Sequence, residues 1–221
     1  MSVPVKTPLL QQMKLKTNPL IEFLPDQHRT RMKDTGELIP WGTTQICSWD
    51  MSKEAMKSIG DTKHIWGPRG NALHDSAQAF LEGKPMPDPG VYSEWIDPLV
   101  NHPIWKKFSP IAVELRMVSP DRFFTGAFDC LLEGPSRDGD TIRVLADFKT
   151  LSKPHSPTRK LSRQMGSYTS LLIDNFQLSV SKCMGIFCRP GSVELTVEEP
   201  DDCLGAWADC LDVFKKTLPD W

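Results

Sequence analysis

The sequence predicts an α/β fold in which a central mixed β-sheet is flanked by helices, with a core of the order αβββαβ. Apolar residues recur at helical spacing over about residues 71–82 and again over about 160–173. Three strand-like runs lie between these two segments, at 111–117, 122–133 and 141–150, and a Gly- and Pro-containing turn at 134–140 joins the last two. Two further strand-like runs, 182–188 and 193–198, precede a closing amphipathic helix that carries Leu204, Trp207 and Leu211 on one face.

The N-terminal third of the chain has weaker signals. Residues 1–25 contain scattered prolines and are expected to be irregular, whereas 29–32 and 37–40 flank a turn-like tetrapeptide and predict a hairpin. A short helix is predicted at 52–58 with Ser52 as its cap, and Gly83 ends the helix that begins near Asn71. The region 95–108 is expected to be a short helix followed by a loop. We therefore predict an N-terminal extension over 1–27 and a single domain over 28–221.

The composition bounds the function without fixing it. A chain of 221 residues is long enough to bury a hydrophobic core. Its net charge of −2 gives no overall electrostatic attraction to nucleic acid. The charge is uneven, because five Lys or Arg and no acid lie between Lys149 and Ile173, whereas acids outnumber bases eight to two from Glu194 onward. A basic segment of this kind suits a polyanionic ligand.

The cysteines and the hydropathy pattern indicate a reducing compartment. The six cysteines contain no C-x-x-C pair, no signal peptide is evident, and no apolar run is long enough to span a bilayer. We expect an intracellular, cytoplasmic protein, or a phage protein inside its host cell, with buried thiols and no membrane partner.

Two carboxylates are predicted at the ends of apolar strand segments. Asp129 lies between Phe128 and Leu131, and Asp147 follows the apolar run 144–146. A buried carboxylate is costly without a partner, and two that converge need a cation between them; oxygen ligands suit Mg²⁺ or Mn²⁺. The alternative is that each aspartate ends its strand by accepting hydrogen bonds from a loop.

Three more residues extend this candidate site. Lys149 follows Asp147 by two positions and so shares its strand face. His74, on the predicted helix after Gly70, becomes a possible third metal ligand beside the two aspartates, although an isolated helical histidine is more often an ordinary residue. Glu114 is a charge within the apolar strand 111–117, and it is equally compatible with a site carboxylate and with a water-facing edge residue.

Gln164 and Tyr168 are four residues apart and therefore share a helix face. Such a helix could pack beside the metal site, with the glutamine holding a backbone group or phosphate and the tyrosine contacting nucleic acid. The alternative is a half-buried tyrosine whose hydroxyl is satisfied within the protein.

Taken together, these residues resemble the PD-(D/E)XK nuclease superfamily, and within it the RecB-like exonuclease branch that includes phage, CRISPR-associated and mitochondrial genome-maintenance exonucleases. The family pattern is G-x-x-x-H on a helix, a strand Glu, G-x-x-D, D-x-K-T and Q-x-x-x-Y. Here the matching positions, in the same order, are Gly70 to His74, Glu114, Gly126 to Asp129, Asp147 to Thr150, and Gln164 to Tyr168. The resemblance implies a restriction-endonuclease-like core.

The resemblance also implies roles for individual residues. His74, Asp129, Asp147 and the Phe148 carbonyl would ligate Mg²⁺ or Mn²⁺, and Lys149 would orient or help deprotonate the attacking water. Gln164 and Tyr168 would shape the site and contact DNA. Arg69, Thr43 and Thr44 are weaker candidates for phosphate contacts.

The expected function is a metal-dependent DNA exonuclease that acts on single-stranded or frayed ends. The alternatives are an endonuclease of the same superfamily and a non-catalytic nuclease-like module that binds DNA or protein. No iron–sulphur cluster is expected, because the cysteines that follow Cys47 do not form the tight pattern of the cluster-bearing members. Recombination or replication proteins are candidate partners, and the sequence gives no indication of the oligomeric state.

Overall fold

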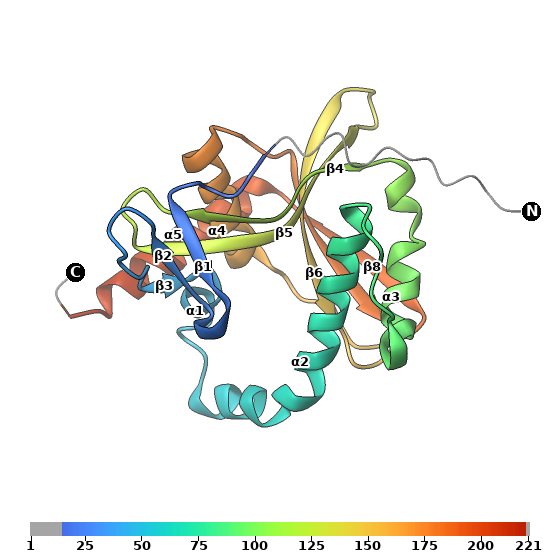
Figure 1. Cartoon of the computed structure of the whole chain (residues 1–221), viewed down its shortest axis with the longest axis horizontal. Coiled ribbons are helices and arrows are strands. Elements are labelled where there is room, and N and C mark those ends of the chain that lie inside the picture. Colours follow the sequence, from blue (N-terminus) through green and yellow to red (C-terminus); the bar gives the residue numbers. More distant parts are fainter. Residues whose placement is uncertain (1–14, 220–221) are drawn as a thin grey trace, which may run out of the picture.

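The computed structural model describes residues 15–219 and shows a mixed β-sheet with helices on both faces (Figure 1). The main sheet has six strands, β3 (Trp41–Gly42), β4 (Ser109–Val118), β5 (Phe124–Pro135), β6 (Thr141–Thr150), β7 (Lys182–Arg189) and β8 (Ser192–Glu198). Neighbouring strands are antiparallel except for β3 with β5 and β6 with β7. The predicted α/β class, with a mixed central sheet flanked by helices, is therefore confirmed.

Five α-helices accompany the sheet: α1 (Thr43–Cys47), α2 (Lys53–Leu81), α3 (Ser93–Val100), α4 (Ser162–Phe176) and α5 (Pro200–Lys216). Short 3₁₀ turns occupy Pro25–Gln27, Gly90–Tyr92 and Pro103–Lys106. Within residues 15–219, no helix is both long enough and apolar enough to cross a bilayer.

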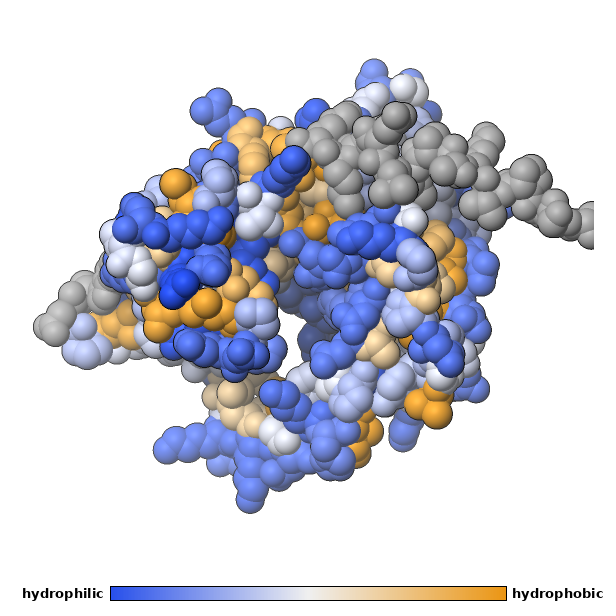
Figure 2. Space-filling model, viewed as in Figure 1, coloured by the Kyte–Doolittle hydropathy of each residue, from blue (hydrophilic) through white to orange (hydrophobic). Residues whose placement is uncertain are grey.

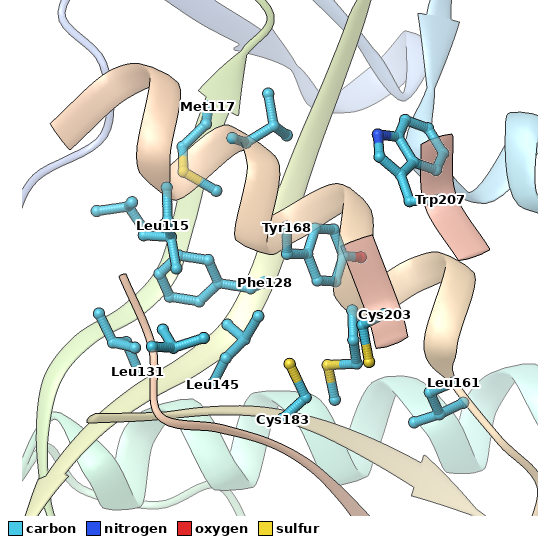
Figure 3. Packing of buried hydrophobic residues seen from close by; sticks show 14 of the residues in the cluster. Leu115, Met117, Phe128, Leu131, Leu145, Leu161, Tyr168, Cys183, Cys203 and Trp207 are labelled. Carbon is cyan, nitrogen blue, oxygen red and sulfur yellow. The ribbon is translucent and has the colours of Figure 1, made fainter. Parts of the chain in front are cut away.

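Each face of the sheet has its own apolar core. On one face, Leu73 of α2 and Ile96 of α3 pack in a cluster with Ala146 and Ile186 of the sheet. On the other face, Tyr168 of α4 and Trp207 of α5 belong to a cluster with Phe128, Leu145 and Cys183, which Figure 3 shows from close by. The sheet therefore lies between two helical layers, each packed on it through its own apolar core, and side chains from both layers contact the sheet.

The sequence prediction of two separate helices at 52–58 and 71–82 is wrong, because α2 runs through both for 29 residues. Ser52 does cap it, since its hydroxyl accepts a hydrogen bond from the Ala55 N–H at 3.1 Å. Pro68 cannot donate to the carbonyl four residues earlier, and Figure 1 shows the helix bending along its length. The first half, before the bend, is almost entirely exposed.

The expectation of irregular structure throughout 1–25 is also wrong for its last residues. Strand β1 (Ile21–Leu24) pairs antiparallel with β2 (Arg29–Met32). The predicted pairing of 29–32 with 37–40 is reduced to a single bridge between Arg31 and Leu38, with neighbouring backbone hydrogen bonds. Residues 21–24 of the predicted N-terminal extension therefore form one strand of a small two-stranded sheet, and 25–27 form the 3₁₀ turn that leads towards the other strand. Residues 1–14 lie outside the described part of the chain.

The main sheet divides where β5 and β6 stop pairing. Their register ends at Cys130 opposite Ala146, and Asp129 and Asp147 are the next residue along each strand. Beyond that point β5 continues with β3 and β4, whereas β6 continues with β7. The two carboxylates therefore lie at the opening between the two parts of the sheet, which both helical layers can reach.

Close backbone approach fixes α4 against its neighbours. A β-carbon on Gly166 would lie 1.9 Å from the carbonyl oxygen of Cys203 in α5. One on Gly126 of β5 would lie 2.6 Å from the Thr43 hydroxyl and 3.0 Å from the Tyr168 ring. The absence of a side chain at these two positions allows α4 to sit directly against α5 and the sheet.

Candidate functional site

Three side chains from different elements form a cluster that could hold a metal ion. His74 of α2, Glu114 of β4 and Asp129 of β5 each present a ligand atom, and these atoms all lie within 4.8 Å of one another. His74 Nδ1 is 3.3 Å from Asp129 Oδ1 and 3.8 Å from Glu114 Oε1. The cluster is reachable from solvent, because the His74 and Glu114 side chains are 35% and 32% exposed.

Glu114 reaches the cluster through an unusual backbone conformation. Its φ angle is 47°, in the left-handed region that costs a non-glycine residue energy, particularly within a strand. Its two neighbours, Val113 and Leu115, keep regular pairs with Cys130 and Phe128 of β5. The sequence left Glu114 undecided between a site residue and an edge residue, and the structure places it in the cluster.

Asp129 also connects the cluster to β6. Its second carboxylate oxygen accepts a hydrogen bond from the Phe148 N–H at 2.5 Å, at the point where the ladder between β5 and β6 has ended. One carboxylate therefore contacts both His74 and the strand that carries Asp147 and Lys149. The Phe148 backbone, predicted to offer its carbonyl to a metal, makes its contact with Asp129 through its N–H.

Asp147 is held by residues other than the histidine cluster. Lys149 Nζ lies 2.5 Å from Asp147 Oδ2, and Gln164 Nε2 donates to Asp147 Oδ1 at 2.9 Å. Oδ2 is buried and makes no hydrogen bond of good geometry, so the ion pair with Lys149 is its contact. The Asp147 side chain is 2% exposed, and this carboxylate can serve a metal only from within the protein.

Gln164 and Tyr168 support Asp147 from α4. The Gln164 amide group donates both to Asp147 and, at 2.9 Å, to the Tyr168 hydroxyl. Tyr168 is 4% exposed and belongs to the core beneath the sheet. Its ring is therefore not placed to stack on a base, and its contribution is to position Gln164, which in turn orients Asp147.

The electrostatics of the site follow from burial and from mutual charge. Burial by itself would lower the pKa of His74, but the charges and hydrogen bonds of Asp129 and Glu114 outweigh it and raise the pKa to about 10. Burial would raise the pKa of Asp129, but His74 and Lys149 hold it below its usual value. Burial raises the pKa of Asp147 to about 6, against the opposing effect of Lys149. Without a metal, His74 is therefore the cation of the cluster at neutral pH.

The weaker phosphate-contact candidates lie in different surroundings. Thr43 is buried, and its hydroxyl lies 2.8 Å from Ser167 and 3.3 Å from the Thr125 carbonyl oxygen, so its position does not favour a phosphate contact. Thr44 is exposed at the start of α1. Arg69 is 8% exposed, with its guanidinium carbon 5.2 Å from the centroid of the Trp95 ring.

The basic segment that follows β6 lies at the surface. Lys153, Arg159 and Lys160 are exposed and make no ion pair with the described residues. Arg163, counted in the same basic run, instead makes two hydrogen bonds to Asp50, at 2.8 and 2.9 Å. Figure 2 shows a hollow lined by hydrophilic residues at the centre of the face that Figure 1 displays, over β5 and β6.

The sequence analysis missed one side chain beside the site. Arg116 of β4 has its guanidinium carbon 3.8 Å from the centroid of the Phe23 ring in β1. Burial lowers its pKa, against the opposing charges of Glu114 and Tyr168. Its position two residues after Glu114 was the available signal. The contact with Phe23 could not be foreseen, because β1 was not predicted.

The cysteines are not gathered into a ligand set. All six lie within the described residues, and none of their sulfur atoms belongs to a group of three or more candidate ligand atoms within 4.8 Å of one another. Burial raises the pKa of Cys47 and of Cys188 to about 12, which favours the inert thiol form.

Comparisons with known proteins add little to this geometry. No family model matches the chain, and no curated protein matches it. Among solved structures, the chain is similar to one titled "Crystal structure of SSO0001", with 12% sequence identity over 78% of this chain and 74% of that chain. The TM-score is 0.38, a level at which the similarity carries no conclusion about function.

Proposed function

We propose that the protein is a metal-dependent nuclease that hydrolyses phosphodiester bonds in DNA, with a core of the PD-(D/E)XK type. One observation carries the proposal. The His74, Glu114 and Asp129 cluster is joined through the Phe148 N–H to the strand that carries the Asp147 and Lys149 ion pair. A histidine, acidic groups and a lysine around an opening in a sheet are suited to hydrolysis of a phosphate ester.

The donor set fits Mg²⁺ or Mn²⁺. Two carboxylates and one imidazole lie close enough together to share an ion, and carboxylate oxygens suit both metals. His74, Glu114 and Asp129 would hold the ion, and the buried Asp147 could become a further ligand only if its Oδ2 turned from Lys149 towards the ion. When bound, the ion would polarise the phosphate and lower the pKa of a water molecule.

The protein residues supply the remaining chemistry. The Lys149 ammonium group, 21% exposed, places positive charge where negative charge builds up on the phosphate, and it can orient the attacking water. Gln164 keeps Asp147 directed towards Lys149. Lys153, Arg159 and Lys160 add a basic surface after β6 that attracts a nucleic-acid backbone.

The decisive experiment is cleavage of end-labelled single-stranded DNA with Mg²⁺ or Mn²⁺. Asp147→Asn and Lys149→Met should each lower kcat at least about 100-fold, the loss typical of removing one charge-stabilising group. Lys182→Met and Asp209→Asn are matched controls, because Lys182 pairs with Glu199 on the surface and Asp209 lies on α5. Full activity in both site variants would remove the site assignment, and a wild type inactive with either metal would favour a binding module.

The type of nuclease is tested with DNA topology. We propose exonuclease action from single-stranded or frayed ends, so linear single strands should be degraded while closed circular single strands persist. Cleavage of the circles at a comparable rate would instead identify an endonuclease.

A further inference from the structure

Two arginines near the candidate site have no acidic partner. Arg69 is buried and Arg116 is half-buried, and neither makes an ion pair with the residues between 15 and 219. By contrast, the other five partly buried arginines, at 31, 122, 143, 163 and 189, each pair with an aspartate or a glutamate, and the remaining three, at 29, 137 and 159, are exposed to water. A guanidinium group withdrawn from water without an ion-pair partner is costly, which suggests that an anion supplied by a ligand completes these two positions.

Arg116 is held by an aromatic ring. Its guanidinium carbon lies 3.8 Å from the centroid of Phe23, so the planar group lies against the ring face. Stacking uses the face of the guanidinium plane and leaves the N–H groups at its edge available, which is the geometry that binds phosphate oxygens. Arg116 follows Glu114 by two residues on β4 and pairs in register with Ala127, two residues before Asp129 on β5, which places its backbone near the carboxylate cluster.

Arg69 repeats this arrangement on another element. It precedes His74 by five residues on α2, and its guanidinium carbon lies 5.2 Å from the centroid of Trp95 in α3. Its Nε atom is buried and has no hydrogen-bond partner. Trp95 donates a hydrogen bond to the Leu151 carbonyl oxygen at 2.7 Å, so Arg69 lies near the chain that leaves β6 just after Lys149.

The sheet order places the two arginines on opposite flanks of the site. Arg116 belongs to β4, which borders β5 on the side away from β6 for most of its length. Arg69 and Trp95 lie near the end of β6, and α3 packs on β7 and β8. Asp129 of β5 and Lys149 of β6 lie between these two positions.

We propose that Arg116 and Arg69 bind backbone phosphates on the two sides of the phosphate that is cleaved, and so fix the path of the nucleic-acid strand from β4 towards α3. The inference rests on the proposed function and adds a strand path that crosses the opening in the sheet. Phe23 and Trp95 act as supports that keep each guanidinium plane in place. Arg116 and Arg69 are positioning residues, and neither is required for the chemical step.

The test measures binding of a labelled single-stranded DNA oligonucleotide in EDTA as a function of KCl concentration. Each phosphate contact to a single strand contributes about 0.7 to the slope of log affinity against log salt concentration. Arg116→Gln and Arg69→Gln should each reduce the slope by about 0.7 and lower affinity at low salt roughly 10-fold, and the double variant should lose about twice that slope. Arg143→Gln is the matched control, since Arg143 pairs with Glu133 near the far end of β6.

Conservative variants separate a phosphate contact from a structural role. Arg116→Lys keeps the charge and should retain the slope, while it loses affinity because an ammonium group lacks the planar fork. Phe23→Leu should also lower affinity with the slope unchanged, and it serves as the test of Arg116 if Arg116→Gln does not fold. Thermal melts identify the folded variants.

The outcomes separate the inference from the proposed function. If the wild type binds and cleaves DNA while Arg116→Gln and Arg69→Gln keep the slope and affinity of Arg143→Gln, the strand path is wrong and the nuclease assignment stands. If Phe23→Leu binds as tightly as the wild type, the support by Phe23 is wrong. A wild type that neither binds nor cleaves DNA overturns both the proposed function and this inference.

Discussion

Glu114 combines a strained backbone with a charge that lies in the candidate metal cluster. Its left-handed conformation is unfavourable for a residue with a side chain, whereas its carboxylate lies beside the His74 cation, which it stabilises. We expect Glu114→Gly to leave the free energy of unfolding of the metal-free protein within about 1 kcal/mol of the wild type, because the relief of the strained φ offsets the loss of the contact with the His74 cation. The same variant should lose most of its Mn²⁺ affinity in calorimetric titration.

Arg122→Gly is the matched control for this prediction. Arg122 also has a positive φ, of 56°, but it lies in a turn where its side chain pairs with Asp34 at the surface. This variant should also stay within about 1 kcal/mol of the wild type, because the relief of strain offsets the loss of the ion pair with Asp34, and it should keep Mn²⁺ binding. Equal Mn²⁺ affinity in Glu114→Gly and in the wild type would contradict a ligand role for Glu114.

His74 should make the metal-free protein sensitive to alkaline pH. Its pKa is raised from 6.5 to about 10 by Asp129 and Glu114, so the protonated form stabilises the folded state. That contribution is complete below about pH 6.5 and is lost as the pH rises through about 10, because the folded state then releases the proton that favours it. In EDTA, the unfolding free energy of the wild type should fall between pH 7 and 10 more steeply than that of His74→Gln. Parallel curves for the two proteins would mean that His74 is not held as a cation.

At the scale of elements, the contact of α4 with α5 depends on a missing side chain. Alanine at position 166 would put its β-carbon 1.9 Å from the Cys203 carbonyl, and backbone cannot move aside as easily as a side chain. We expect Gly166→Ala to lower the unfolding free energy in urea by about 1–3 kcal/mol. Gly60→Ala is the control, and its effect should have the opposite sign. Gly60 lies in α2 with open space beside it, so alanine should raise the unfolding free energy by up to about 1 kcal/mol. A stable Gly166→Ala protein would contradict this close approach.

Local patterns were sufficient to predict most elements from β4 to α5. Strands β4, β5 and β6 have long apolar runs with a clear turn between the last two, and Trp207 and Phe214 on α5 recur at helical spacing. The two errors arose where local signals conflict with tertiary structure. The stretch between the two predicted helices contains Gly67 and Pro68, which disfavour a helix, yet α2 continues through them with a bend. Strand β1 has only four residues, too few to be recognised without its partner β2.

The candidate site was also predictable in part from local sequence patterns. Motif order along the chain identified His74, Asp129 and Lys149, which lie in or next to the same opening in the sheet. The side-chain partners were harder to predict, because they depend on backbone angles and on where strand pairing ends. The left-handed Glu114 and the placement of Arg116 on Phe23 follow from such tertiary details.

At the scale of the whole molecule, the candidate metal ligands connect helix α2 to the paired strands β4 and β5. They come from α2, β4 and β5, and Asp129 reaches on to β6 across the end of the ladder. An ion that binds this cluster only in the folded state should stabilise the entire domain, by about 2.7 kcal/mol at a concentration 100 times its dissociation constant. For a chain of this size, that corresponds to a rise in melting temperature of roughly 5–10 °C.

Thermal melts in EDTA and in increasing Mn²⁺ measure this coupling directly. The melting temperature of the wild type should rise steadily with Mn²⁺, whereas Asp129→Asn should show little change, because it weakens the one carboxylate that contacts both His74 and Phe148. Asp209→Asn carries the same change of charge on α5 and should respond like the wild type. If Asp129→Asn gains as much as the wild type, the stabilising ion binds elsewhere, and the cluster at the opening of the sheet is not the metal centre.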